Sequence, residues 1–362
     1  MKKRVVLGLS GGVDSAVAAY LLKQQGYEVI GVFMRNWDSQ LNNDILGNPT
    51  NDNDICPQEQ DYNDAKAVAK HLGIEIRRVD FIKEYWDKVF TYFIDEYAKG
   101  RTPNPDILCN KHIKFKAFLE YAEELNADFI ATGHYARIDK LPNGRYAIRR
   151  SATLAKDQTY ALYNLTQEQL VHTLMPVGNY SKDKIREMAE EIGLQVANKP
   201  DSQDICFVPD GDYAKFIEEN SGKKIPEGNF VWTDGTVIGK HKGITHYTIG
   251  QRKGLGLAMG RPVVVTEIRP ETGEVVIGEA DAVFRTTLRA NRLNWMSVPD
   301  IEGEARFLAK IRYNHSGSMC TVRKIEEDLV ECTFDEPVRA VTPGQAVVFY
   351  DGDYVAGGGT IL

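Results

Sequence analysis

The clearest chemical signal in the sequence is a short glycine-rich stretch near the N-terminus. Residues 9–15 read Leu-Ser-Gly-Gly-Val-Asp-Ser and follow an apolar run at Arg4–Leu9 that is typical of a buried strand. Ala16–Gln25 has the composition of a helix and ends at Gly26. A glycine turn between a strand and a helix directs the free N–H groups of the helix start toward one point, where an anion can bind. We therefore predict a phosphate loop at residues 9–15.

The residues of this loop separate it from the commoner nucleotide-binding motifs. It lacks the Gly-Lys-[Ser/Thr] ending of a Walker loop, and it does not read Gly-x-Gly-x-x-Gly. Ser-Gly-Gly-Val-Asp-Ser resembles the PP-loop of the ATP pyrophosphatases, which cleave ATP between the α and β phosphates and transfer AMP to a carbonyl oxygen. The resemblance implies that Ser10, Gly11, Gly12, Asp14 and Ser15 hold the pyrophosphate, with Asp14 positioning either magnesium or the loop itself. The loop leaves the identity of the acceptor open.

Two cysteines lie in flanks that are unlike those of a core strand. Cys109 follows Thr-Pro-Asn-Pro-Asp-Ile-Leu and precedes Asn110 and Lys111, near the expected start of a helix. A helix N-terminus and a nearby lysine both lower the pKa of a thiol, and Asp106 could act as an acid or a base. Cys206 follows Asn-Lys-Pro-Asp-Ser-Gln-Asp-Ile. Either cysteine alone is by default a buried structural thiol, but flanks rich in Pro, Asp, Asn and Lys favour a chemical role.

The spacing of all five cysteines excludes the usual cysteine frameworks. Cys56, Cys320 and Cys332 complete the set, and no Cys-x-x-Cys pair occurs. A zinc site, a thioredoxin motif and a secreted disulfide scaffold are therefore not expected, and we predict no protein-bound metal. Cys56 falls in a long polar stretch at residues 38–63 and has no predicted role.

Length and composition indicate a multidomain globular protein. The chain has 362 residues, of which 43% are hydrophobic and 26% charged. No apolar run approaches the ~20 residues of a membrane span, and the N-terminus lacks a secretory h-region. A net charge of −7 argues mildly against nucleic acid as a partner, although basic clusters occur, the most suggestive between Lys240 and Lys253. We expect a cytoplasmic monomer without a membrane partner.

The order of the expected elements predicts an α/β fold followed by β-rich parts. Strands are expected at Arg4–Leu9, Glu28–Met34, Ile74–Phe81 and Phe129–Thr132, and helices at Ala16–Gln25, Tyr62–Leu72, Lys114–Leu125, Gln167–Leu174 and Lys182–Ile192. This alternation predicts a doubly wound parallel sheet.

After residue 207, Gly, Pro and Thr become frequent and short β-rich runs replace helices. Expected strands are Pro262–Arg269 and Glu274–Gly278, which form a hairpin, and then Ala305–Tyr313, Met319–Ile325, Leu329–Phe334 and Ala346–Tyr350. The predicted domains are 1–207, the α/β catalytic domain; 208–280, a small β-rich domain; and 281–362, a β-barrel.

Five motifs together give a closer resemblance. They are Ser-Gly-Gly-Val-Asp-Ser, Pro-Asn-Pro-Asp-Ile-Leu-Cys-Asn, Ala-Thr-Gly-His-Tyr at 131–135, Lys-Asp-Gln at 156–158 and Asp-Ser-Gln-Asp-Ile-Cys-Phe, and the tail adds residues 309–313 and 343–346. Their order and spacing resemble the family of tRNA-specific 2-thiouridylases, MnmA or TrmU, across the whole chain. The fold that this implies is a PP-loop domain of the adenine nucleotide α-hydrolase type.

The resemblance implies a reaction and assigns roles to named residues. ATP and Mg²⁺ bind at the loop, and the O2 oxygen of a wobble uridine in tRNAs for Lys, Glu and Gln attacks the α-phosphate. Cys206 carries a persulfide whose outer sulfur, or sulfide that Cys109 frees from it, attacks the activated carbon, and Cys109 closes a disulfide with Cys206. A sulfur-donor protein, either a cysteine desulfurase or a sulfur-relay protein, is the implied second partner beside tRNA. The implied ATP contacts are Gly8, Leu9, Ser10, Gly11, Gly12, Val13, Asp14, Ser15, Met34 and Gly133. Asn104, Pro105 and Asp106 are implied to contact the base, and the implied tRNA contacts are His134, Lys156, Asp157, Gln158, Arg312, Tyr313 and Gln345.

Three other functions stay open on the sequence. A PP-loop ligase related to GMP or NAD synthetase would adenylate a small-molecule carbonyl without needing paired cysteines. An iron–sulfur-dependent tRNA thiolase would need cluster ligands, which the absent Cys-x-x-Cys does not support. A non-enzymatic RNA-binding protein would not need an intact loop and both cysteines.

Overall fold

The computed structural model describes residues 2–37, 57–200, 212–221 and 225–362. These residues divide into two compact units. The first holds the described residues of 2–89, 106–200 and 353–356, and the second those of 90–105, 212–352 and 357–362. Within the described ranges, no helix combines the length and the apolar character that a membrane span requires. The domain limits 1–207, 208–280 and 281–362 stay a prediction.

A five-stranded parallel sheet, in the order β3-β2-β1-β4-β7, forms the centre of the first unit. Val6 on the central strand β1 lies opposite Ile30 on one side and Ile130 on the other. The predicted doubly wound parallel sheet is confirmed. The strands are β1 (Arg4–Gly8), β2 (Glu28–Arg35), β3 (Glu75–Asp80), β4 (Phe129–Ala131) and β7 (Thr173–Leu174).

Strand β7 corrects the expected helix Gln167–Leu174. The helix α7 spans only Gln167–Val171, where Thr166 and Gln169 form a capping box at its start. The chain then turns at His172, and Thr173 and Leu174 pair with Ile130 and Ala131. Two residues are too few to give a strand pattern in the sequence, so pairing with β4 decides their conformation.

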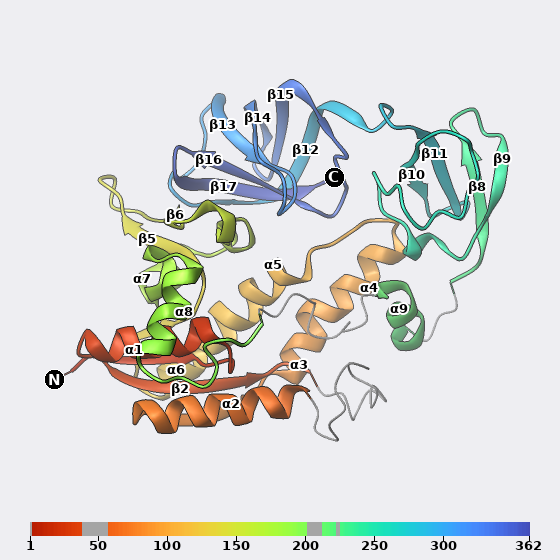
Figure 1. Ribbon diagram of the computed structural model, residues 1–362. Helices are drawn as coiled ribbons and strands as arrows, with labels where there is room; N and C mark the ends of the chain where they lie inside the picture. Colours follow the sequence, from red (N-terminus) through yellow and green to blue (C-terminus); the bar gives the residue numbers. More distant parts are fainter. Residues whose placement is uncertain (1, 38–56, 201–211, 222–224) are drawn as a thin grey trace. The chain divides into compact units, whose positions relative to one another are not determined.

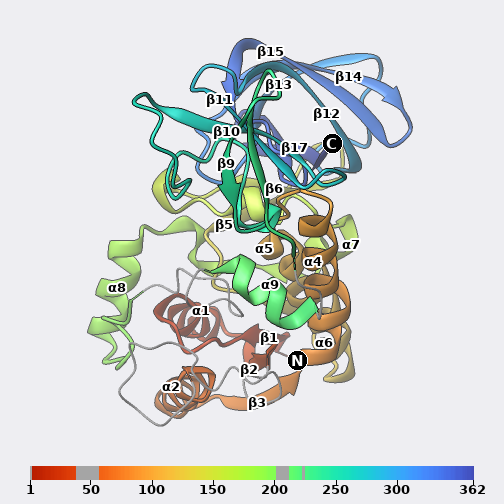
Figure 2. The same ribbon diagram turned by 90° about the vertical axis from the view of Figure 1, so that its right-hand side faces the viewer.

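Helices cover both faces of this sheet. Helices α1 (Val13–Gln24), α2 (Pro57–Leu72) and α8 (Lys182–Glu191) share one apolar core with Val5, Leu7 and Leu9. The side chains of a strand alternate, so Gly8 faces the other way, where a Cβ would lie 3.8 Å from Phe118 Cε1 on α6 (Phe118–Glu124). Figure 2 shows α1, α2 and α8 on one side of β1 and β2, with α6 on the other.

The helix that carries Cys109 is longer than the predicted Lys114–Leu125. It runs without a break through α5 (Pro105–Cys109), the π-helical η2 (Asn110–Ala117) and α6, ending at Glu124. Proline suits a first helical position because it lacks the N–H that is unpaired there, which explains the start at Pro105. Cys109 is therefore the fifth helical residue. A π-helical turn directly after it is a feature that often accompanies functional sites.

The first unit also contains an unpredicted hairpin of β5 (Ala136–Lys140) and β6 (Tyr146–Arg150), and Tyr354 pairs with Arg149 of β6. Its remaining short elements are helical. They are α3 (Ile82–Tyr85), η1 (Trp86–Phe90), η3 (Leu154–Lys156), η4 (Thr159–Leu162) and η5 (Pro176–Asn179).

A four-stranded sheet in the order β10-β11-β8-β9 belongs to the second unit. Phe230, Val265 and Ile277 are fully buried in its core. The predicted hairpin is confirmed, because β10 and β11 pair antiparallel around the turn 270–273. The elements here are α4 (Thr91–Ala98), α9 (Tyr213–Ser221), β8 (Gly228–Trp232), β9 (Val237–His241), η6 (Ile244–His246), β10 (Val263–Arg269) and β11 (Glu274–Glu279).

The predicted C-terminal β-barrel is confirmed as a closed barrel, drawn in blue in Figure 1. Its strands follow the order β12-β15-β14-β13-β16-β17, and a β12–β17 pairing closes the circle. Closure removes the exposed strand edges that an open sheet would carry. The strands are β12 (Phe284–Trp295), β13 (Glu304–Lys310), β14 (Ser318–Glu326), β15 (Leu329–Arg339), β16 (Ala346–Asp351) and β17 (Tyr354–Ile361), of which β12 and β17 were not predicted.

Candidate active site

The phosphate loop connects the end of β1 with the start of α1, as the sequence predicts. Gly11 has a φ of +78°, a backbone conformation that favours glycine. Gly12 is the N-cap of α1, and no side chain of the described residues caps the N–H groups there. Because β2 and β4 flank β1 on opposite sides, the loop lies at the point where the strand order reverses, which is where open α/β sheets bind ligands. The helix start can therefore accept an anion.

The two serines of the loop bind each other. Ser15 Oγ donates to Gly12 O at 3.0 Å and accepts from Ser10 N at 3.2 Å. Ser10 Oγ lies 3.1 Å from Ser15 Oγ. These contacts hold the turn together, and the Ser15 hydroxyl donates its proton to the Gly12 carbonyl within the loop.

Asp14 is held by two residues from distant parts of the first unit. Its carboxylate accepts from Lys182 Nζ at 2.8 and 2.9 Å and from Tyr135 Oη at 2.6 Å. Lys182 is buried at the start of α8, and its ammonium group forms an ion pair with Asp14. Of the two roles that the sequence left open for Asp14, these contacts favour positioning of the loop.

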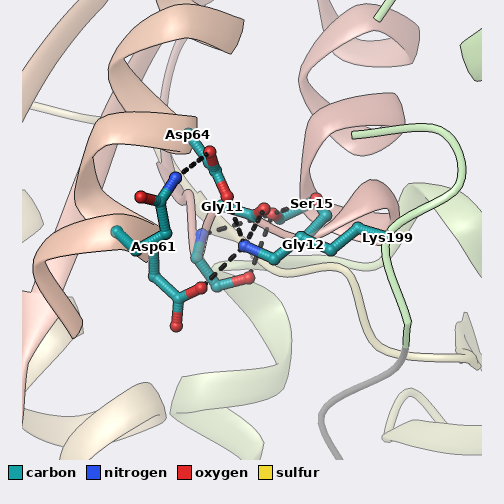
Figure 3. Close-up of polar contacts among 8 residues, drawn as sticks. Gly11, Gly12, Ser15, Asp61, Asp64 and Lys199 are labelled. Carbon is teal, nitrogen blue, oxygen red and sulfur yellow. Dashed lines mark hydrogen bonds and ion pairs between the residues drawn. The ribbon is translucent and has the colours of Figure 1, made fainter. Parts of the chain in front are cut away.

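A second cation contacts the outer side of the loop (Figure 3). Lys199 Nζ donates to Gly11 O at 3.1 Å, to Asp61 Oδ1 at 2.7 Å and to Asp64 Oδ2 at 2.5 Å. Asp61 and Asp64 are three residues apart on α2 and so share one face of that helix. Burial alone lowers the pKa of Lys199, but its hydrogen bonds to the two carboxylates outweigh burial and raise it. Lys199 is therefore a permanent cation beside the loop.

Gly8 and Gly133 let other parts of the first unit approach the loop closely. A Cβ at Gly133, just after β4, would lie 2.8 Å from Ser15 N, and a Cβ at Gly8 would lie 2.8 Å from Met34 Cε on β2. Gly133 therefore borders the loop, and Met34 lies against the end of β1 just before it. Their predicted role in nucleotide binding stays a prediction.

Cys109 lies on the long helix that packs under this sheet. Its thiol is buried with 6% of the residue exposed, while Asp106, one turn earlier, is exposed. The next residue, Asn110, is buried as well, and its Nδ2 donates to Ala161 O at 3.0 Å. Its Oδ1 has no hydrogen-bond partner among the described residues. Cys109 thus starts a buried polar turn rather than an apolar one.

Positive charge surrounds the turn after Cys109. Burial, followed by the charges of Lys111, Lys116 and Lys88, lowers the pKa of His112 to about 4. His112 lies three residues after Cys109, so these lysine charges act close to the start of η2.

The remaining cysteines fall into two groups. Cys206 and Cys56 lie outside the described residues. Cys320 and Cys332 are fully buried on adjacent barrel strands, and contact with Cys320 raises the pKa of Cys332 far above its ordinary value. Neither is suited to act as a nucleophile.

Comparison with known proteins supplies what the geometry leaves open. Three family models match the chain: a tRNA methyl transferase HUP domain at residues 3–210, a tRNA methyl transferase PRC-barrel domain at 214–279 and an aminomethyltransferase beta-barrel domain at 285–361. The tRNA-specific 2-thiouridylase MnmA of Lachnoclostridium phytofermentans is 57% identical over 360 residues, which cover 99% of each chain. That of Clostridioides difficile is 51% identical over 362 residues, covering 100% of this chain and 98% of the relative.

The chain belongs to the family of tRNA-specific 2-thiouridylases. The predicted resemblance is thereby confirmed over the full length. The roles that the resemblance implied for individual site residues stay predictions.

The predicted base-contact motif of this thiouridylase family spans the first turn of the Cys109 helix. Pro105 is buried and Asn104 half-buried directly before Asp106. In the second unit, Thr102 fixes the approach to this motif, because its N–H donates to Pro343 O at 2.9 Å and its carbonyl accepts from Gln345 Nε2 at 2.8 Å. Gln345, which is predicted to contact tRNA, is thus hydrogen-bonded to Thr102, two residues before Asn104.

Two of the three residues in the Lys-Asp-Gln motif form hydrogen bonds within the first unit. Asp157 accepts from Ser151 N at 2.9 Å and from Thr159 Oγ1 at 2.5 Å. Gln158 Oε1 accepts from Tyr135 N at 2.8 Å. These contacts favour loop positioning for Asp157 and Gln158, whereas Lys156 stays half-exposed.

His134 links the loop to the Cys109 helix. Its ring lies 5.7 Å from that of Phe115 on η2, and its Nδ1 lies 2.8 Å from Thr132 Oγ1. Burial and the charge of Lys114 lower its pKa well below the ordinary value, so it is neutral at physiological pH.

Arg312 is half-buried and Tyr313 exposed, directly after barrel strand β13. Arg312 Nη1 donates to Arg339 O at 2.8 Å, and 43% of Tyr313 is exposed beside Lys310, whose Nζ is 5.9 Å from the ring centroid. A cation next to an exposed aromatic ring suits an RNA base or phosphate.

Sequence reasoning missed the residues that support the loop: Lys182, Tyr135, Lys199, Asp61 and Asp64. Tyr135 belongs to the Ala-Thr-Gly-His-Tyr motif and Lys199 to the residues that precede Cys206, but nothing in their spacing connects them with residues 11–14. Only the fold brings them together.

Proposed function

We propose that this chain is an ATP-dependent tRNA 2-thiouridylase that replaces O2 of the wobble uridine with sulfur. The observation that carries the ATP half of this proposal is the start of α1 at Gly12, which no side chain of the described residues caps. It lies at the switch point of a parallel sheet, and Gly133 approaches it closely. The tRNA half rests on relatives that are named 2-thiouridylases and match the chain over its full length. The proposed tRNAs are those for Lys, Glu and Gln.

The residues around the loop fit ATP. Gly8, Gly11 and Gly133 carry no side chain where the backbone must approach closely, and N–H groups at the start of α1 can bind the β and γ phosphates. Lys182 and Lys199 hold the loop through Asp14 and through the carbonyl of Gly11, and each offsets carboxylate charge near the loop. Cleavage between the α and β phosphates would leave pyrophosphate on these N–H groups, while the uridine O2 takes AMP.

Magnesium would bind mainly through the phosphates of ATP. Among the described residues, no group of three His, Cys, Asp or Glu side chains could hold a metal ion. Asp14, the acid within the loop itself, already has Lys182 and Tyr135 as partners. The divalent ion would then neutralise phosphate charge without a protein cage, as is common for Mg²⁺.

Sulfur transfer assigns different steps to the two cysteines. Cys206 would carry a persulfide that a sulfur-donor protein supplies. The Cys109 thiolate would attack the Cys206 sulfur, the S–S bond of the persulfide would break, and hydrosulfide would leave as the Cys109–Cys206 disulfide forms. Hydrosulfide would add to C2 of the adenylated uridine and expel AMP, and a thiol reductant would then reopen the disulfide.

Two of the matching family models are named after methyl transfer to tRNA, a reaction that the site does not favour. A methyl transferase needs no pyrophosphate-binding loop, and the phosphate loop is intact here. The buried Cys109 at the start of a polar π-helical turn, in a cationic setting, suits thiolate chemistry. A small-molecule ligase would leave this cysteine and the tRNA-contact residues without a use.

One reaction tests the proposal. The protein is incubated with unmodified tRNA for Lys, ATP, Mg²⁺, cysteine, a cysteine desulfurase and a thiol reductant, and the digested nucleosides are examined by mass spectrometry. We expect 2-thiouridine together with AMP and pyrophosphate, all dependent on ATP. Pyrophosphate release with a small acid and no RNA would instead support the ligase, and a strict iron requirement would support the cluster-dependent thiolase.

A further inference from the structure

Lys199 makes three hydrogen bonds with its three ammonium protons. Its acceptors are the carbonyl of Gly11 and one carboxylate oxygen each of Asp61 and Asp64 (Figure 3). Only 27% of its side chain is exposed. An ammonium with three near acceptors is satisfied in one position, so its orientation is fixed.

The contact with Gly11 determines the orientation of one peptide group of the loop. The C=O of Gly11 and the N–H of Gly12 belong to the same planar trans peptide and point in opposite directions. When Lys199 binds the carbonyl on the outer side of the loop, the N–H of Gly12 faces inward, toward the anion position. A positive φ at Gly11 makes this peptide easier to rotate, because glycine has few steric barriers.

The same lysine offsets part of the negative charge of two carboxylates that lie next to the loop. Helix α2 packs so tightly here that a Cβ on Gly11 would lie 2.2 Å from Asp61 O. Without a cation, Asp61 and Asp64 would repel a triphosphate bound on the other side of the loop.

We infer that Lys199 is a positioning residue for the phosphate loop: it turns the Gly11–Gly12 peptide so that the N–H of Gly12 points toward the pyrophosphate of ATP, and it offsets part of the negative charge of Asp61 and Asp64. This inference rests on the proposed ATP site and adds a residue that acts through the loop backbone without touching the nucleotide.

The test measures binding of the non-cleavable α,β-methylene analogue of ATP by calorimetry. Lys199→Met should raise the Kd by about 10-fold or more, the loss of a charge-assisted hydrogen bond. The triple variant Lys199→Met, Asp61→Asn, Asp64→Asn removes the unpaired carboxylates and should still bind about 5-fold more weakly, because Gly11 has lost its donor. Affinity for tRNA should change by less than about 3-fold in both variants.

Lys184→Met is the matched control, because this lysine pairs with Glu187 on the same unit and makes no contact with the loop. It should bind the analogue like the wild type. If Lys199→Met does not fold, the triple variant can still be measured, because it contains no carboxylate at position 61 or 64 that has lost its cation. Wild-type affinity in Lys199→Met, or in the triple variant, would overturn the positioning role. Failure of the wild-type protein to bind the analogue would overturn the proposed ATP site instead.

Discussion

The phosphate loop and the Cys109 helix use their backbones and side chains in opposite ways. In the loop, backbone N–H groups are the binding groups, and side chains such as Asp14 and Ser15 are occupied with holding the backbone. In the helix, the reactive group is a side chain, and a continuous backbone from Pro105 to Glu124 holds it. A single substitution removes a reactive side chain. A backbone N–H group cannot be substituted in this way, and it is disturbed only by replacing the side chains that position it. The expected effects of mutation therefore differ in size between the two regions.

Cys109→Ser should have the largest effect. Replacing sulfur with oxygen removes the thiolate that resolves the persulfide, so we expect 2-thiouridine formation to fall by about 1,000-fold or more. Binding of ATP and of tRNA should stay within about 3-fold, because serine preserves the size of the buried side chain. Nucleoside mass spectrometry and equilibrium binding measure the two quantities.

Cys332→Ala provides the comparison for Cys109→Ser. This cysteine is fully buried in the barrel core, so its loss should cost about 1–2 kcal/mol of unfolding free energy and leave the activity of the folded protein unchanged. Equal loss of activity in both variants would mean that the thiol of Cys109 has only a structural role.

Asp14→Asn should have the next largest effect, through a support of the loop. The amide removes the negative charge that accepts two hydrogen bonds from the buried Lys182 ammonium, so we expect a loss of about 2 kcal/mol in unfolding free energy. The Kd for ATP should rise by about 10-fold as the loop loosens. Asp183→Asn, an exposed acid in the first turn of α8, should change stability by less than about 0.5 kcal/mol. Unaltered ATP affinity in Asp14→Asn would show that the loop does not need this support.

Gln345→Ala should have a smaller effect that separates two roles. If Gln345 mainly holds Thr102, the base-contact segment loosens and kcat falls by about 5-fold, as for one neutral hydrogen bond, while the KM for tRNA is unchanged. A rise in the KM for tRNA at constant kcat would show instead that Gln345 acts by direct contact with the RNA. Steady-state kinetics with tRNA as the varied substrate distinguish the two.

The smallest expected effect concerns the protonation of His112. Its folded pKa of about 4 lies below the ordinary 6.5, so between these values the unfolded chain binds a proton that the folded protein does not. Stability should therefore decline as the pH falls from 6.5 toward 4, and His112→Gln should flatten part of this decline. Activity between pH 7 and 8 should be the same in both proteins. Thermal unfolding measured across this pH range provides the test, and an identical decline in both would contradict the assignment.

The phosphate loop can be predicted from the sequence, but the side chains that hold it in place cannot. The phosphate loop, the parallel sheet and the β-barrel follow from local patterns, because a glycine turn, an apolar run and a hairpin each act over a few residues. Lys182 and Lys199 contact Asp14 and Asp61 across 168 and 138 residues, and no periodicity connects positions that far apart.

Strand β17 shows a second limit of sequence reading. It contains Gly357 and Gly359, and glycine is depleted in strands, so the run did not look like one. A Cβ at Gly357 would lie 2.5 Å from Trp295 Cε3, and one at Gly359 would lie 2.7 Å from Asn291 O. The glycines are needed where β12 and β17 close the barrel, and that requirement exists only in the folded protein.

An isotope experiment tests the central claim most directly. A tRNA substrate carrying ¹⁸O at O2 of the wobble uridine is thiolated with ATP and a sulfur donor, and the AMP that is released is examined by mass spectrometry. If ATP activates the uridine through its O2 oxygen, each 2-thiouridine formed should be matched by one AMP that contains ¹⁸O. Unlabelled AMP alongside 2-thiouridine would contradict adenylation of the uridine at the phosphate loop.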